Sequence, residues 1–266
     1  MKRLPLAGRR IVVTRPKGQA AGLSTLIREA GGEALEVPAL QIGDLPDLAL
    51  FDAVAERLES FDYAIFASKN AVRRAFALLE ARRSGRSWPA NLQVATVGGG
   101  SREELLARGF SSVIAPGGQS DSEALLALPE FADPARVAGK RIVIFRGEGG
   151  RRLLGETLEA RGAVIEHAPC YRRTLPAAGG ALLAAALDGG KVDAVLVSSA
   201  EGLANLLEML GGDASRRIAG AAFFVPHPRV ADEVSRRGIG RSVVAGPGDA
   251  QMAAALVAYF SGAGYN

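Results

Sequence analysis

The sequence repeats one pattern at a fixed spacing, and this repeat limits the folds open to the chain. Residues 62–72 read DYAIFASKNAV and residues 193–203 read DAVLVSSAEGL, so the two segments begin 131 positions apart. The same spacing aligns residues 8–31 with residues 139–162 through a second, different pattern of glycines, arginines and apolar residues. A period this long excludes a solenoid and indicates two copies of one domain.

Each copy alternates short apolar runs with stretches of helical spacing. The runs are rich in β-branched and aromatic residues, which is typical of strands buried on both faces of a parallel sheet. After one run, leucines recur three and four positions apart, as on one face of a helix. We therefore predict an α/β fold with two similar doubly wound parallel-sheet domains. The predicted strands are residues 11–15, 63–68, 94–98, 142–146, 194–199 and 221–226.

Two other segments, residues 33–47 and 163–176, alternate in polarity and contain prolines. Proline cannot donate to a strand ladder, so we predict edge strands or connectors here rather than central strands. The repeat by itself also leaves open a simple tandem division of the chain near residue 138.

Composition and charge exclude several classes of protein. The 266 residues are 48% hydrophobic and 23% charged, as in globular proteins, and no apolar run approaches the roughly 20 residues needed to cross a bilayer. The net charge is +4, but arginines are dispersed in pairs and only 6% of residues are aromatic, which favours a small polyanionic ligand over nucleic acid. The first residues lack the apolar core of a signal peptide, and Cys170 is the single cysteine; both suit the cytoplasm.

The turns that follow the predicted strands are rich in glycine, serine, asparagine and arginine. Ligands of open α/β sheets bind beyond the carboxyl ends of the strands, where helix N-termini present free N–H groups. Two such edges facing each other would line a cleft with donors for an anion. The alternative for Ser68, Ser101 and Ser199 is an ordinary helix N-cap. The six turns read TRPKGQ, ASKNAV, VGGGSRE, RGEGGRR, SSAEGL and PHPRVA.

Cofactor motifs are absent from the sequence. There is neither a GxGxxG fingerprint nor a phosphate loop, and His167 and His227 have no companion ligands at metal-binding spacing. We therefore predict no cofactor and no metal. His227 directly follows a strand, which suits a binding site or a structural role, whereas Cys170 has no neighbouring base and suits a small apolar residue. Tyr171 offers a phenol that can donate a proton or pack at a joint between domains.

An ordered set of motifs resembles the uroporphyrinogen-III synthase family: VVTRP, PAL, IFASKNAV, VATVG, IFRGEGGRRLLGETL, CYRR, VSSAEGLANL and GDAQMAAAL. The resemblance covers essentially the whole chain. It implies two α/β domains joined by a two-stranded connector. The first domain would combine residues 1–38 with 173–266 and the second would be residues 42–170, with connectors at about 38–42 and 170–173.

The resemblance implies a cyclising hydro-lyase of heme biosynthesis. Its substrate would be hydroxymethylbilane, a linear tetrapyrrole with eight carboxylates, and its product uroporphyrinogen III, formed with inversion of ring D and loss of water. Such an enzyme needs no cofactor. We expect a cytoplasmic monomer that binds neither nucleic acid nor membranes, and a transient contact with the preceding enzyme of the pathway stays open.

The resemblance also assigns residues to the site. Tyr171 would donate a proton to the leaving hydroxyl. The PHPR turn departs from relatives that have glycine and threonine there, so a contact at that corner would fall to His227 or Arg229. The implied substrate-binding residues are Arg15, Ser68, Lys69, Asn70, Gly98, Gly99, Ser101, Arg146, Gly147, Gly149, Arg151, Ser198, Ser199, Glu201, His227 and Arg229.

Two other functions fit the same sequence. A non-enzymatic two-lobed protein that binds or senses a small anion would also have duplicated α/β lobes, although most such proteins carry an export signal. A two-domain transferase acting on a nucleotide-linked substrate is disfavoured by the missing phosphate loops.

Overall fold

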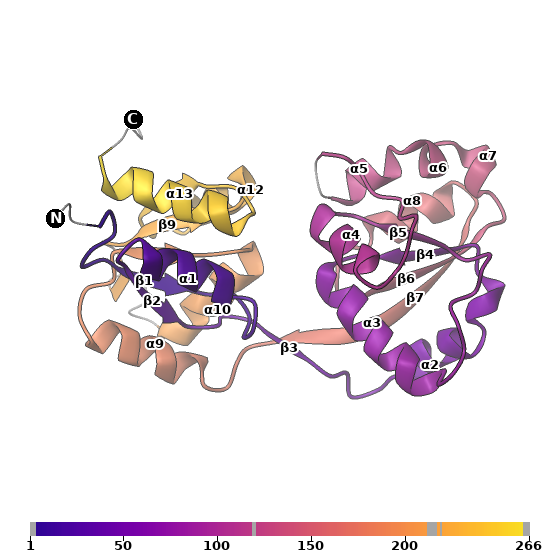
Figure 1. The fold of residues 1–266 in the computed structure, drawn as a ribbon, viewed down its shortest axis with the longest axis horizontal. Coiled ribbons are helices and arrows are strands. Elements are labelled where there is room, and N and C mark those ends of the chain that lie inside the picture. The colour runs from indigo at the N-terminus through magenta and orange to yellow at the C-terminus, as the bar shows by residue number, and fades with distance from the viewer. Residues whose placement is uncertain (1–3, 119–120, 212–216, 219, 263–266) are drawn as a thin grey trace. The chain divides into compact units, whose positions relative to one another are not determined.

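The computed structural model describes residues 4–118, 121–211, 217–218 and 220–262. The chain divides into two compact units, called here unit 1 (Met1–Gln41 with Thr174–Asn266) and unit 2 (Ile42–Arg173). Each unit has a five-stranded sheet flanked by helices (Figure 1). The predicted fold class, two similar parallel-sheet α/β domains, is confirmed. None of the described helices combines the length and apolar character that a membrane span requires.

Unit 1 has the strand order β10-β9-β8-β1-β2, and its four strand pairs are all parallel. The first strand of the chain lies inside this sheet, because Ile11 of β1 pairs with Ala194 of β8 on one side and with Ala34 of β2 on the other. Its elements are β1 (Arg10–Val13), α1 (Ala21–Glu29), β2 (Glu33–Glu36), α9 (Gly179–Asp188), β8 (Ala194–Leu196), α10 (Ala200–Leu210), β9 (Ala222–Val225), α12 (Pro228–Arg236), β10 (Arg241–Val244) and α13 (Asp249–Phe260).

Successive residues of the unit 1 strands belong to different hydrophobic clusters. Val12 and Phe223 pack in one cluster with leucines of α9 and α10. Ile11 and Phe224 pack in the other with residues of α1 and α13. Helices therefore cover both faces of the sheet, which explains why these strands are apolar throughout instead of alternating in polarity.

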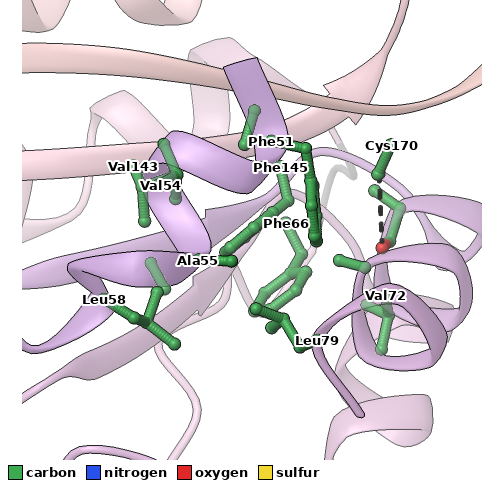
Figure 2. Close-up of a cluster of buried hydrophobic side chains, with 14 of the residues drawn as sticks. Phe51, Val54, Ala55, Leu58, Phe66, Val72, Leu79, Val143, Phe145 and Cys170 are labelled. Carbon is green, nitrogen blue, oxygen red and sulfur yellow. Dashed lines mark hydrogen bonds between the residues drawn. The ribbon is translucent and has the colours of Figure 1, made fainter. Parts of the chain in front are cut away.

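Unit 2 has the strand order β3-β7-β6-β4-β5, with parallel pairing from β7 to β5. Its core contains stacked aromatic rings, including Phe66 on Phe145, and Cys170 lies beside them (Figure 2). Its elements are β3 (Gln41–Gly43), α2 (Ala49–Glu56), the 3-10 helix η1 (Leu58–Ser60), β4 (Tyr63–Phe66), α3 (Lys69–Arg82), β5 (Gln93–Thr96), α4 (Gly99–Leu106), α5 (Ser122–Leu126), α6 (Pro129–Ala132), α7 (Pro134–Val137), β6 (Arg141–Gly147), α8 (Leu153–Ala160) and β7 (Val164–Thr174).

The sequence repeat is interleaved between the two units. Strands β1 and β2 begin 131 positions before β6 and β7, and β4 begins 131 positions before β8. The equivalent strands take equivalent places, since β9-β8-β1-β2 in unit 1 matches β5-β4-β6-β7 in unit 2. Each sheet therefore combines strands from both copies of the repeat, and the chain does not form a simple tandem pair divided near residue 138.

The prediction of an edge strand or connector is correct for β2. For residues 163–176 the connector is correct, since the chain passes from unit 2 to unit 1 between Arg173 and Thr174, but an edge strand is wrong. Strand β2 ends its sheet, whereas β7 lies between β3 and β6. The ladder between β6 and β7 shifts register after Arg146, which pairs with Pro169. An irregularity at that point accommodates the missing N–H group of the proline, so the strand can lie inside the sheet.

Candidate functional site

The predicted site residues lie at or just beyond the carboxyl ends of strands in both units. Because the strands in each sheet are parallel, these ends fall on one edge of that sheet. Unit 1 contains Arg15, Ser198, Ser199, Glu201, His227 and Arg229; unit 2 contains Ser68, Lys69, Asn70, Gly98, Gly99, Ser101, Arg146, Gly147, Gly149, Arg151 and Tyr171.

Tyr171 is the centre of a small polar cluster in unit 2. The residue is 1% exposed, and its hydroxyl lies 3.1 Å from Oγ of Ser68. Arg173 donates to the same hydroxyl across 3.5 Å. On another side the ring packs against Gly147, where a Cβ atom would come within 2.7 Å of a ring carbon. These contacts fix the position of the phenol and leave Ser68 as its hydrogen-bonded neighbour at the end of β4.

Ser68 has two roles in the structure. Its Oγ accepts a hydrogen bond of 3.0 Å from the Ala71 N–H and so caps α3. Ser199 caps α10 in the same way, by accepting from the Gly202 N–H at 3.0 Å. The N-cap interpretation is therefore correct for both residues, although Ser68 also contacts Tyr171. It is wrong for Ser101, which is buried inside α4, where Gly98 holds the N-cap position.

Arg146, at the end of β6, lies close to Tyr171. Burial lowers the pKa of its guanidinium, and the nearby charges of Arg152 and Arg173 lower it further, while Tyr171 acts in the opposite direction. Its side chain donates to the Gly147 carbonyl across 3.4 Å, and no carboxylate of the described residues pairs with it. A half-buried cation among like charges attracts an anion strongly, because water screens it poorly.

Other predicted side chains of unit 2 are paired near the surface. Lys69 reaches Glu104 across 3.9 Å, and Arg151 binds Glu123 across 2.7 Å. The hydrogen bond from Arg151 to Glu123 raises the pKa of this arginine.

The unit 1 edge differs in its electrostatics. Arg15 forms an ion pair with Asp249, the first residue of α13. His227 is exposed at the N-cap position of α12 without a side-chain capping bond, and Arg229 is exposed two residues later. Both side chains could therefore meet a ligand in solution.

The surroundings of Cys170 and His167 determine what these two side chains can do. Burial raises the pKa of the Cys170 thiol to about 12, so it stays protonated and unreactive. Burial, followed by the charge of Arg146, lowers the pKa of His167, which keeps this imidazole neutral at pH 7. The described residues contain no group of three or more His, Cys, Asp or Glu side chains arranged to hold a metal ion.

Two residues that lie at these sheet edges, Arg173 and Asp249, were not assigned to the site from the sequence. Arg173 belongs to the CYRR motif, and its guanidinium carbon lies 5.9 Å from the centre of the Tyr171 ring. The motif itself could have indicated it. Asp249 is 234 positions from Arg15, and only the sheet topology brings the two together.

Comparison with known proteins identifies the family. The family model described as uroporphyrinogen-III synthase HemD matches residues 21–254, which include most of both units. The chain belongs to the uroporphyrinogen-III synthase family. This confirms the family predicted from the motifs.

Individual uroporphyrinogen-III synthases agree with the family match. The chain is 37% identical to the synthase of Salmonella typhimurium over 166 residues, which are 61% of this chain and 64% of that protein. It is 30% identical to the synthase of Synechococcus elongatus over 228 residues, or 84% of each protein. A crystal structure of a mutant uroporphyrinogen III synthase from Thermus thermophilus aligns with a TM-score of 0.61 and 17% identity, over 95% of this chain and 97% of that one. The last likeness supports the fold.

Proposed function

We propose that the chain is a uroporphyrinogen-III synthase: it closes hydroxymethylbilane into uroporphyrinogen III, inverting ring D and releasing water, in heme biosynthesis. The observation that carries this proposal is the family match, which runs from residue 21 to residue 254. Enzymes of this name among its relatives are 30% and 37% identical to it.

This reaction depends more on control of the substrate's conformation than on acceleration of its chemical steps. The bilane loses its hydroxyl readily and closes unaided to the isomer without inversion. The enzyme must therefore hold the ends of the substrate so that the new bond forms at the substituted carbon of ring D. Substrate carboxylates would be held by arginines such as Arg146 and by the N–H groups at the strand ends described above.

We assign the proton donor to Tyr171 acting through Ser68. Since Tyr171 is 1% exposed, it would pass its proton to Ser68, whose Oγ is 3.1 Å away, as Ser68 gives its own proton to the leaving hydroxyl. The C–O bond breaks with its electron pair on oxygen, so water leaves and an azafulvenium cation remains. Arg173 and Arg146 would stabilise the phenolate that is left on Tyr171.

The deciding experiment supplies purified protein with freshly prepared hydroxymethylbilane and measures the isomer formed. We expect type III product to replace the type I product that forms in the heat-denatured control. Type I product alone, from protein shown to be folded by circular dichroism, would refute the synthase and favour the small-anion binding protein.

We further propose a cytoplasmic monomer without a cofactor. The single cysteine supports the cytoplasm, because its thiol is buried and has no partner for an internal disulfide. Because the substrate closes wrongly on its own, we also propose that the preceding enzyme delivers it through a transient contact. Sedimentation of the chain alone tests the monomer, and sedimentation of its mixture with that enzyme tests the contact.

A further inference from the structure

Two arginines occupy equivalent places in the two units. Arg15 follows β1, and Arg146, 131 positions later, is the last but one residue of β6. Both strands lie inside their sheets, β1 between β8 and β2 and β6 between the equivalent strands β4 and β7. The two guanidinium groups therefore occupy equivalent positions in the two copies of the duplicated fold. Any difference between the side chains around them distinguishes one copy from the other.

In unit 1 a carboxylate of the chain itself neutralises this arginine. Oδ1 of Asp249 pairs with Nη1 of Arg15, and the Arg15 side chain is only 17% exposed. The other carboxylate oxygen, Oδ2, lies against Gly22 of α1, where a Cβ atom would be 2.7 Å away. Asp249 is therefore packed between Arg15 and the first turn of α1, and Gly22 leaves the space for it.

In unit 2 the acidic residues at the corresponding place, Asp121 and Glu123, contact groups other than Arg146. Residues 108–125 correspond to residues 237–256, so the start of α5 takes the place of the start of α13. There, Asp121 accepts a hydrogen bond of 2.8 Å from the Ala124 N–H, and Glu123 binds Arg151. Within the part of the chain that the structure describes, neither acid pairs with Arg146.

We propose that Asp249 is an internal counter-anion that determines which of the two equivalent arginines, Arg15 or Arg146, binds the substrate. It occupies the position where a substrate carboxylate would meet Arg15, so the carboxylates of the bilane bind at Arg146 and only weakly at Arg15. This assignment rests on the proposed function for the identity of the polycarboxylate. It makes Asp249 a specificity-determining residue that acts through Arg15 and does not touch the reacting atoms.

The test measures binding of uroporphyrin, a stable cyclic tetrapyrrole with eight carboxylates, by fluorescence titration of the full chain. We expect Asp249→Asn to tighten binding by roughly threefold to tenfold, since one charge-assisted contact becomes available to the ligand. Arg146→Gln should weaken binding by about tenfold, whereas Arg15→Gln should change it by less than about twofold. In the double variant Asp249→Asn with Arg15→Gln, the gain should disappear, because the released guanidinium is no longer there.

Asp188→Asn is the matched control for net charge. Asp188 pairs with Arg217 across 3.1 Å at the surface of unit 1, and its substitution changes the net charge of the chain by the same amount. We expect no change in uroporphyrin affinity from this variant. An equal gain in both variants, or a gain that persists in the double variant, would overturn the proposal. Should Asp249→Asn fail to fold, Asp249→Ser removes the same charge and keeps an oxygen at the start of α13.

The isomer assay separates this proposal from the proposed function. A chain that forms no type III product but gains uroporphyrin affinity through Asp249→Asn would refute the synthase and support the counter-anion. An active synthase whose affinity is unchanged by Asp249→Asn, with equal losses from Arg15→Gln and Arg146→Gln, would refute the counter-anion alone.

Discussion

The phenol of Tyr171 is held by contacts on several sides. Gly147 packs against its ring, and Ser68 and Arg173 hydrogen-bond its oxygen. Because Arg173 donates to the phenol oxygen, the phenol keeps its own proton available for the hydrogen bond with Ser68. A phenol that only packed at an apolar joint would have no such polar partners. This geometry supports the assignment of Tyr171 and Ser68 to proton transfer.

Tyr171→Phe should lower the rate of type III formation by about tenfold to a hundredfold, at or below the lower end of the usual contribution of a general acid. The loss stays modest because the bilane loses its hydroxyl readily. Ser68→Ala should cause a similar loss if the proton passes through its Oγ. Tyr63→Phe is the control, since Tyr63 is 8% exposed and lies at the opposite end of β4 from Ser68. An unchanged rate in Tyr171→Phe would remove this residue from the mechanism.

Gly147→Ala should displace the ring of Tyr171, because the added Cβ would lie 2.7 Å from it. We expect the free energy of unfolding to fall by about 1–3 kcal/mol, as for other overpacked sites, and activity to fall with it. Thermal unfolding and the isomer assay measure the two effects. Gly100→Ala serves as the control, since no atom lies within 4 Å of its added Cβ. Equal behaviour of the two variants would show that Gly147 is not needed for the position of the ring.

At this scale the sequence predicts which residues lie at the strand ends but not how they pair. The positions of Ser68, Arg146 and Tyr171 follow from strand order, because polar residues after buried runs must fall on one edge of a parallel sheet. Whether an arginine is neutralised depends on side chains far away in sequence. Asp249 reaches Arg15 only because β1 and β8 pair, so the charge difference between the copies required the structure.

Among the helices, α3 is attached to its neighbours at its C-terminal end. Arg83, which follows α3, is 7% exposed. It donates a hydrogen bond of 2.7 Å to the Ala55 carbonyl of α2. It also pairs with Glu59 of η1, and this hydrogen bond lowers the pKa of Glu59 to about 2. Because Glu59 is ionised at a lower pH in the folded protein than in the unfolded chain, the pair stabilises the folded state above pH 4.5.

Glu59→Gln should therefore change the pH dependence of stability. The difference in Tm between the natural protein and the variant should be largest above pH 4.5, the ordinary pKa of this carboxyl, and should vanish as the pH falls towards 2. Calorimetry across this range measures it. Glu103→Gln removes a carboxylate from an exposed position of α4 and is the control for the loss of one charge. A constant difference for both variants would contradict the role of the Arg83–Glu59 pair.

The elements themselves were largely predictable from the sequence. Each predicted strand overlaps an observed one, since apolar β-branched runs of this length have few alternatives in a doubly wound fold. The position of β7 inside the sheet was not predictable, because a proline such as Pro169 is typical of an edge strand. The register shift that accommodates this proline depends on the partner strand β6, which no local pattern describes.

For the whole molecule, the main feature is that unit 1 is discontinuous and unit 2 is continuous. The repeat established that two equivalent domains exist, but a repeat shows only which segments are alike. It does not show which copies pair in a sheet, because either pairing buries the same apolar faces. The pairing of β1 with β8 decides this.

A polypeptide of residues 42–173 should fold alone, because unit 2 is one continuous segment and contains two complete hydrophobic clusters. Residues 174–266 alone should not fold, since they lack β1, which lies inside the sheet, and helix α1, which covers one of its faces. Adding a peptide of residues 1–41 should restore cooperative unfolding in urea, followed by circular dichroism. Cooperative unfolding of residues 174–266 without the peptide would contradict this reading of unit 1.

The interleaved order has a consequence for synthesis on the ribosome. Strand β1 emerges first, yet β8, its partner on one side, is encoded about 180 codons later, and the helices α10 and α13 later still. At typical rates of elongation the apolar segment around Ile11 waits roughly ten to forty seconds while the middle of the nascent chain folds. During that delay it is exposed to chaperones and to neighbouring chains, so mutations that slow translation of the last third should reduce yield without altering the finished protein.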